Sequence, residues 1–220
     1  MGGGSEQKMA IENSYKIRTK GRHLFLRVVK GHFMKSNGHM NYYIDVMKQK
    51  CTLPEAMAVA EELLSYYKDK VIDTILCLDE MQVIGTCLAQ KLANAGFMNL
   101  NDGRAINILT PEKISAGRFI FREETVPFVS GKSVLILTSS VATGRTTSVA
   151  MDAIRYYGGT VAGLASIYSA VSECDGVPVC SVFDANDLDG YYCVPAHECP
   201  LCKAGRNVDG VVSSYGFSHS

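Results

Sequence analysis

The sequence predicts an α/β fold with a central, mostly parallel sheet flanked by helices. Short apolar runs, typical of strands buried on both faces, alternate along the chain with segments of helical periodicity. This alternation is the pattern of βαβ units. The chain contains no internal repeat, no low-complexity tract and no proline-rich linker that would divide it. We therefore expect a single domain over residues 1–220.

The helices are predicted from apolar spacing and from the residues at their ends. "LPEAMAVAEELLSYYKD" begins at Leu53, has apolar residues at helical intervals and places Pro54 in the first turn. "VIGTCLAQKLANAGF" has the same periodicity and is expected to end near Gly96. "TTSVAMDAIRYYGG" is expected to end at Gly158 and Gly159. The first of these segments precedes a predicted strand, and the other two lie between predicted strands.

The strands are predicted from apolar runs too short for a helix. "KVIDTILCLDE" and "KSVLILT" are the most continuous and are typical of the middle of a parallel sheet. "RAINILT", "TVAGLASIYSA" and "VPVCSVFDA" are further strands. "GRFIFREETVPF" alternates and predicts an exposed strand or hairpin arm.

Composition excludes several classes of function. The 22 basic and 22 acidic residues cancel, so no net charge favours nucleic acid or an anionic membrane as a partner. No apolar run approaches the roughly 20 residues that span a bilayer. Residues 1–22 lack an apolar signal core and are expected to be a flexible leader. The lack of a signal core and the scattered positions of the eight cysteines together favour free thiols and a cytoplasmic location.

The stretch "VLILTSSVATGRTT" carries the main functional signal. It joins a predicted buried strand to a predicted helix, and ligands of parallel sheets bind beyond the carboxyl ends of the strands. Backbone N–H groups around Gly144, the side chains of Thr143, Arg145, Thr146 and Thr147, and the positive end of the helix suit a phosphate group. A capped loop without a ligand is the alternative interpretation.

Three separated segments resemble one protein family. "KSVLILTSSVATGRTTSVAMDAIRYYGGTVAGL" resembles the signature of type I phosphoribosyltransferases, and "VVKGHFMKSNGHMNYYIDV" and "YYCVPAHECPLCKAG" are similar to the two ends of orotate phosphoribosyltransferases. The resemblance covers roughly residues 23–205. It implies a small hood formed by both termini, a homodimer, and 5′-phosphate binding by residues 143–147. The apolar "RFIFREETVPF" arm is a candidate part of the dimer interface. The tail over residues 190–220 belongs to the hood.

The chain departs from this family at its chemical positions. The family's paired acids on the ribose side correspond to Thr138 and Ser139, and hydroxyls do not carry the negative charge that an oxocarbenium-like centre needs. The pyrophosphate loop of the family corresponds to "LDEMQVIG", where Asp79 and Glu80 would repel a diphosphate and Gly85 is retained.

The chain also lacks basic residues at two positions where the family has them. Its catalytic Arg-Lys pair leaves only Lys113, within "LTPEKISAG". Its orotate-binding arginine corresponds to Ala170, so a carboxylate substrate would lose a bidentate partner. The scaffold is therefore expected to be retained and the reaction centre to be rebuilt or lost.

Two hypotheses for the function remain open. The first is an orotate phosphoribosyltransferase-like enzyme of pyrimidine biosynthesis, which transfers, or formerly transferred, a phosphoribosyl group from phosphoribosyl pyrophosphate to a base such as orotate. It would use Mg²⁺, with Lys113 neutralising the leaving group. The second is a non-catalytic module that keeps the 5′-phosphate loop and binds a nucleotide or ribose phosphate.

The sequence does not predict a metal site. Cys199 and Cys202 form a Cys-x-x-Cys pair, which is half of a structural zinc site, but the spacing of Cys193 and His197 is irregular. A reduced tail without zinc is therefore favoured. Asp79 and Glu80, as adjacent residues at a strand end, are expected to point apart into a solvated loop. His32 and His39 fit hydrogen-bonded structural histidines better than catalytic ones.

Overall fold

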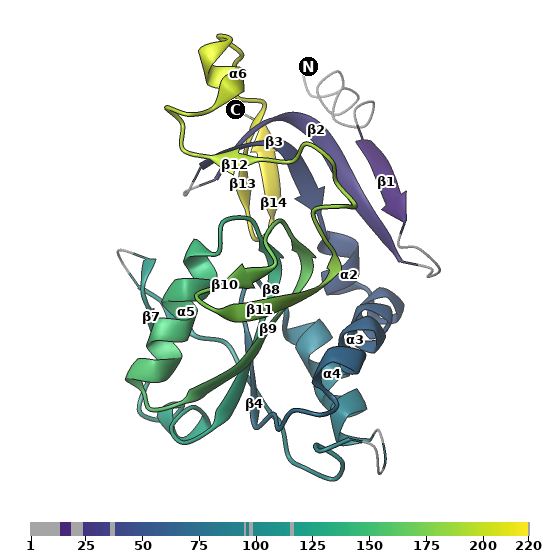
Figure 1. The fold of residues 1–220 in the computed structure, drawn as a ribbon, viewed down its shortest axis with the longest axis vertical. Coiled ribbons are helices and arrows are strands. Elements are labelled where there is room, and N and C mark those ends of the chain that lie inside the picture. The colour runs from purple at the N-terminus through teal and green to yellow at the C-terminus, as the bar shows by residue number, and fades with distance from the viewer. Residues whose placement is uncertain are drawn as a thin grey trace, which may run out of the picture. The chain divides into compact units, whose positions relative to one another are not determined.

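The computed structural model describes residues 14–18, 24–35, 38–94, 96, 99–114 and 117–219. They pack as two compact units (Figure 1). Unit 1 combines both ends of the chain, Met1–Met47 and Ala185–Ser220, and unit 2 is the continuous segment Lys48–Asp184. A small unit made from both termini agrees with the expected hood.

Unit 2 contains the predicted parallel sheet. Its strand order is β10-β11-β9-β8-β4-β5, and each pair is parallel except the hairpin of β10 and β11. Helix α4 (Gln82–Ala93) connects β4 to β5 and helix α5 (Arg145–Tyr156) connects β8 to β9, as predicted for βαβ units. The strands are β4 (Thr74–Cys77), β5 (Asn107–Leu109), β8 (Ser133–Val141), β9 (Thr160–Ser169), β10 (Glu173–Cys174) and β11 (Val177–Phe183).

The helices predicted from periodicity are confirmed as α3 (Leu53–Tyr67), α4 (Gln82–Ala93) and α5 (Arg145–Tyr156). The pair α3 and α4 lies on one side of the sheet of unit 2, and α5 lies on the other (Figure 1). The fold is therefore α/β with a covered sheet, which is why β4 is buried along its whole length. Within the described residues, no helix combines the length and the apolar character needed to cross a membrane.

The register of the sheet brings two functional segments together. Cys77 of β4 lies beside Leu137 of β8, and Thr138 of β8 lies beside Ser166 of β9. The chain leaving β4 toward α4 therefore runs next to the carboxyl end of β8. This edge is where the sequence predicts a ligand site.

The segment predicted as an exposed arm enters a hairpin, but two of its aromatic side chains, Phe119 and Phe121, are buried. Phe119 on β7 (Phe119–Ile120) pairs with Lys113 on β6 (Glu112–Lys113), and a short 3₁₀ helix, η2 (Val126–Phe128), follows. Phe119 and Phe121 belong to the hydrophobic core of unit 2, and the Phe121 ring packs edge-on against Tyr157. The rings of Phe119 and Phe121 therefore complete the chain's own core, whereas Phe128 of the same segment is exposed.

Unit 1 is built on a mixed sheet. Its strand order is β12-β3-β2-β13-β14, with β1 added to β2. Of the expected leader, residues 14–18 form β1, and residues 1–13 and 19–22 lie outside the described residues. The elements of unit 1 are β1 (Ser14–Arg18), β2 (Phe25–Lys35), β3 (Gly38–Asp45), β12 (Cys193–Val194), α6 (Pro200–Lys203), β13 (Gly210–Ser213) and β14 (Gly216–His219). Helix α2 (Met47–Cys51) begins at Met47, where the first segment of unit 1 ends, and continues into unit 2.

Acid stability is expected to depend on Asp73, which precedes β4. Its carboxylate accepts the Ser133 N–H at 2.9 Å and an Arg104 N–H at 2.8 Å. The bond from Ser133, with that from Arg104, lowers the pKa of Asp73 despite partial burial. A lowered folded-state pKa stabilises the protein above the unfolded value of about 3.9, and this stabilisation is lost as pH falls further. We expect Asp73→Asn to lower the unfolding midpoint at pH 7 and to flatten its acid dependence, measured by thermal melts.

The exposed Asp69, in the turn after α3, provides the control for this prediction. Asp69→Asn removes the same charge without removing a strand contact, and should leave the acid dependence unchanged. An equal loss of stability in both variants would show that net charge, rather than the bonds to Ser133 and Arg104, is responsible.

Candidate functional site

The turn between β8 and α5 requires glycine at position 144. Gly144 is the residue that precedes α5 and adopts a left-handed backbone conformation, with φ of +79°. A β-carbon at this position would lie 2.6 Å from the Cys174 sulfur. Both conditions exclude other side chains, because the left-handed region disfavours them and the space is already filled.

A small network holds this turn from inside. The Thr147 hydroxyl donates to the Gly144 carbonyl at 2.6 Å, and the Ser148 hydroxyl donates to the same oxygen at 3.1 Å. The Cys174 sulfur lies 3.3 Å from both hydroxyls and from that carbonyl. Thr147 was expected to offer its hydroxyl to a phosphate, but this hydroxyl is buried and stabilises the turn.

The backbone N–H groups of the turn remain available. Ser148 makes the first main-chain bond of the helix, to the Gly144 carbonyl at 2.8 Å. In the described part of the chain, the N–H groups of Arg145, Thr146 and Thr147 form no hydrogen bond. Free N–H groups and the positive helix end together favour an anion at this position. Thr143 and Arg145 are exposed, so their side chains also remain free to approach it.

An acid from the neighbouring strand reaches the two hydroxyls at the end of β8. One oxygen of Asp79 accepts from Thr138 at 2.7 Å and from Ser139 at 2.9 Å. Both hydroxyl residues are buried, and Asp79 itself is in the left-handed region, with φ of 51°. The resemblance implies a loss of negative charge at positions 138 and 139. The structure places a carboxylate there from a different part of the chain.

Glu80 points to a different partner. It is also in the left-handed region, with φ of 58°, and its carboxylate lies 3.5 Å from the Lys50 ammonium, which is only 3% exposed. Two consecutive residues in this region are costly and indicate a turn held by the surrounding structure. The two acids were expected to point apart into a solvated loop; they have separate partners, but these partners are buried residues of the protein.

Two other expected site residues lie apart from these contacts. Gly85 is inside α4, not in the turn after β4, and a β-carbon there would lie 2.5 Å from the Cys77 sulfur. Close packing of the helix on the strand therefore accounts for this glycine. Lys113 is exposed on β6, and among the described residues no hydrogen bond or ion pair of its ammonium group is formed.

Two residues at this site were not identified from the sequence. Cys174 contacts the turn between β8 and α5. It lies just before Asp175 and Gly176, which both have positive φ and form a two-residue hairpin turn into β11. The Asp-Gly pair is a strong hairpin signal and could have placed Cys174 at a strand end. Ser166, beside Thr138, is fully buried, and within the described structure its hydroxyl has no hydrogen-bond partner.

Comparison with solved structures identifies the fold. A phosphoribosyltransferase from Corynebacterium diphtheriae matches with a TM-score of 0.52 at 18% identity, over 84% of this chain and 96% of that chain. The Mycobacterium tuberculosis H37Rv orotate phosphoribosyltransferase matches with a TM-score of 0.50 at 16% identity, over 84% and 97%. Leishmania donovani UMP synthase matches with a TM-score of 0.53 at 17% identity, and the match covers 84% of this chain and 37% of that chain.

No protein-family model matches the chain, and no curated protein matches it either. The structural likeness nevertheless spans most of the chain, at sequence identities that show the fold alone. The sequence resemblance is confirmed at this level. The chain has the fold of the type I phosphoribosyltransferases.

Proposed function

We propose that this protein binds the 5′-phosphate of a ribose phosphate or nucleotide at the turn between β8 and α5. The observation that carries the proposal is the row of N–H groups of residues 145–147, which form no hydrogen bond within the described chain at the amino end of a 12-residue helix. Phosphate groups bind at such helix ends because free donors and the helix dipole act on the same point. The phosphoribosyltransferase fold supports a phosphorylated sugar as the ligand class.

The acids after β4 favour a monophosphate over a diphosphate ligand. The Asp79 carboxylate bonds to Thr138 and Ser139, the positions that would face the ribose in the proposed site. It can accept hydrogen bonds from ribose hydroxyls, but it would repel a second phosphoryl group placed near it. A nucleoside monophosphate or ribose 5-phosphate has ribose hydroxyls to donate and no second phosphoryl group near the carboxylate.

We expect uridine 5′-monophosphate to raise the thermal unfolding midpoint, and uridine to have no effect. At a ligand concentration 100 times the dissociation constant, the gain in free energy of unfolding should approach about 2.7 kcal/mol. The measurement is a thermal shift titration of the full chain, with ribose 5-phosphate and inorganic phosphate as further probes. Equal shifts with uridine and its monophosphate, or no shift with any phosphate compound, would contradict the proposal.

A second candidate is phosphoribosyl transfer to a base such as orotate, with phosphoribosyl pyrophosphate and Mg²⁺. The specific observation in its favour is again the position of Asp79. The hydroxyls of Thr138 and Ser139 carry no negative charge, but the Asp79 carboxylate that they bond to does. A carboxylate there would stabilise positive charge developing on the ribose ring. Lys113 would then neutralise the leaving diphosphate. Release of diphosphate from phosphoribosyl pyrophosphate, dependent on orotate, tests this candidate.

A further inference from the structure

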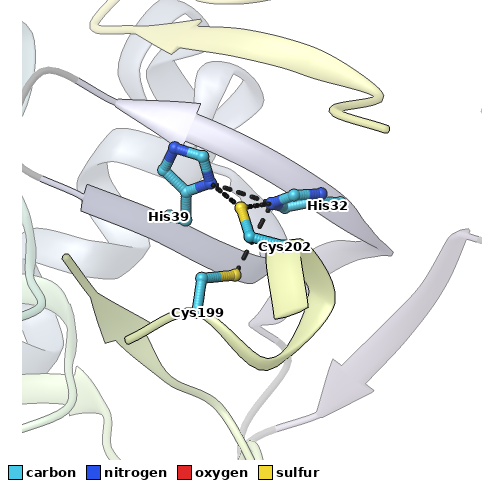
Figure 2. Close-up of side chains that lie close together, drawn as sticks. All are labelled: His32, His39, Cys199 and Cys202. Atoms are coloured by element: carbon cyan, nitrogen blue, oxygen red, sulfur yellow. Dashed lines mark hydrogen bonds between the residues drawn. The ribbon is translucent and has the colours of Figure 1, made fainter. Parts of the chain in front are cut away.

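Four metal-binding side chains gather in unit 1, outside the phosphate site. They are His32 on β2, His39 on β3, Cys199 at the start of α6 and Cys202 within α6 (Figure 2). One nitrogen or sulfur atom from each residue lies within 4.8 Å of the others. We call these four residues the His-Cys cluster.

The distances within the His-Cys cluster match the edges of a tetrahedron around one ion. His32 Nε2 lies 2.9 Å from His39 Nδ1 and 3.6 Å from each of the two cysteine sulfurs, and Cys202 Sγ lies 3.2 Å from His39 Nδ1. A tetrahedral zinc ion with Zn–N near 2.0 Å and Zn–S near 2.3 Å separates two nitrogens by about 3.3 Å and nitrogen from sulfur by about 3.6 Å. Small outward shifts of the rings would complete the geometry.

The tautomer of His32 is set for metal binding. Its Nδ1 lies 2.9 Å from the Arg206 carbonyl and 3.1 Å from the Asn207 carbonyl. Both neighbours are acceptors, so Nδ1 must carry the proton, and Nε2 presents its lone pair to the other three residues. A backbone carbonyl that holds the distal nitrogen of a histidine is a regular feature of metal ligands.

The two innermost members of the cluster are shielded from solvent. Cys199 and His32 are both 0% exposed, and the Cys199 sulfur lies 3.6 Å from His32 Nε2. A metal ion that binds at this point would take the sulfur as a thiolate and displace its proton.

The same geometry argues against other centres. Hard cations prefer oxygen ligands, and this set has none. A two-iron cluster with two histidines on one iron and two cysteines on the other would separate the pairs, whereas here each histidine nitrogen lies within 3.6 Å of a cysteine sulfur. Two nitrogens and two sulfurs around one point are the ligand set of a structural zinc site.

We propose that His32, His39, Cys199 and Cys202 bind one Zn²⁺ ion in a structural site. The ion ties the carboxyl-terminal segment to the β2–β3 hairpin. This connection has a physical purpose, because α6 has four residues and none of them is buried, so apolar packing of the helix contributes little to holding it. A metal or a cross-link commonly stabilises such short segments in small units.

The partners of the Cys-x-x-Cys pair differ from those considered in the sequence. Cys193 lies on β12, where it pairs with Met40 of β3, and His197 is exposed beside Glu198. Neither belongs to the His-Cys cluster. Instead, β12 aligns with β3 so that Val194 lies opposite His39, and the chain that follows brings Cys199 to the histidines.

The first experiment is metal analysis of the full chain purified under reducing conditions. We expect about one zinc per chain, retained through gel filtration and released when a thiol-modifying mercurial is added. The variant Cys202→Ser should lose the zinc, and the matched variant Cys193→Ser, which removes a thiol outside the cluster, should keep it. Zinc retained fully in Cys202→Ser would overturn the proposal.

A second measurement does not depend on the folding of a variant. The protein produced with Co²⁺ in place of Zn²⁺ should show the intense visible bands of tetrahedral cobalt and a sulfur-to-cobalt charge-transfer band. X-ray absorption of the zinc form should give two nitrogen and two sulfur neighbours. A metal-free chain, a chain with an all-oxygen metal environment, or a Cys199–Cys202 disulfide in the reduced preparation would each overturn the proposal.

Discussion

Replacing Gly144 by alanine is expected to lower the free energy of unfolding by about 2–5 kcal/mol and to abolish stabilisation by uridine 5′-monophosphate. The left-handed conformation costs a non-glycine residue about 1–2 kcal/mol. The new β-carbon would also lie 2.6 Å from the Cys174 sulfur, and overpacking of this kind costs about 1–3 kcal/mol. Relief of the contact must move the turn that carries the N–H groups of residues 145–147. Chemical denaturation and thermal shift titration measure the two effects.

The hairpin before β11 offers a matched control. Gly176 has nearly the same backbone conformation, with φ of +75°, but a β-carbon there would meet nothing within 4 Å. Gly176→Ala should therefore cost only the conformational part and leave ligand binding intact. The double variant Gly144→Ala with Cys174→Ala should recover part of the loss, because the sulfur in contact is gone. Equal effects of Gly144→Ala and Gly176→Ala would show that the contact with Cys174 is unimportant.

The fold of unit 2 could be predicted because its signals are local. A buried parallel strand such as β8 is a continuous apolar run, and a helix such as α3 has apolar residues at regular intervals. The prediction was less accurate for the segment around Phe119 and Phe121. Alternation there predicts an exposed arm, but both rings enter the core of unit 2. Alternation alone does not say which face of a short strand is covered.

The conformation of the turn between β8 and α5 could be predicted for the same reason. Its glycine, its hydroxyl residues and the helix that follows are consecutive in the chain, so their arrangement follows from local geometry. The role of Thr147 could not be predicted, because its hydroxyl bonds to Gly144 within a turn that also packs on Cys174. A hydroxyl that faces a ligand and one that stabilises its own turn look alike in a sequence.

The contacts that could not be predicted from the sequence are those between distant segments. Asp79 and Thr138 are 59 positions apart, and only the register of β4 and β8 shows that the acid bonds to the hydroxyl. His32 and Cys199 are separated by 167 positions and meet only because β12 adds to the sheet of unit 1. In both cases the residues could be identified as candidates from the sequence, but their contact partners could not be predicted.

The position of Asp79 makes it the residue that separates the two candidate functions. As a charge near the phosphate turn, it opposes a diphosphate ligand. As a carboxylate held by two hydroxyls, it is a candidate to stabilise charge on a ribose ring. Asparagine is nearly the same size, tolerates the left-handed conformation that position 79 requires, and keeps an oxygen that accepts from Thr138 and Ser139. Asp79→Asn therefore changes the charge with little change in shape.

If the protein is a monophosphate-binding module, Asp79→Asn should bind phosphoribosyl pyrophosphate about tenfold more tightly. Two like charges at 4 Å repel by about 4 kcal/mol at an effective dielectric of 20, and partial exposure of Asp79 reduces this to about 1–2 kcal/mol. Affinity for uridine 5′-monophosphate should change much less. Isothermal titration of both ligands, with and without Mg²⁺, measures the difference.

If the protein instead transfers a phosphoribosyl group, the same variant should lose activity, because the charge that stabilises the ribose cation is gone. Loss of one preorganised electrostatic group typically costs about 10²–10³ in rate. Glu80→Gln is the control: Glu80 lies beside Lys50, and its change alters the local charge equally without affecting the hydroxyls of Thr138 and Ser139. A fall in orotate-dependent diphosphate release in Asp79→Asn alone supports transfer, whereas tighter phosphoribosyl pyrophosphate binding without turnover supports the binding module. Equal behaviour of the two variants would mean that the bonds from Thr138 and Ser139 to Asp79 only stabilise the turn.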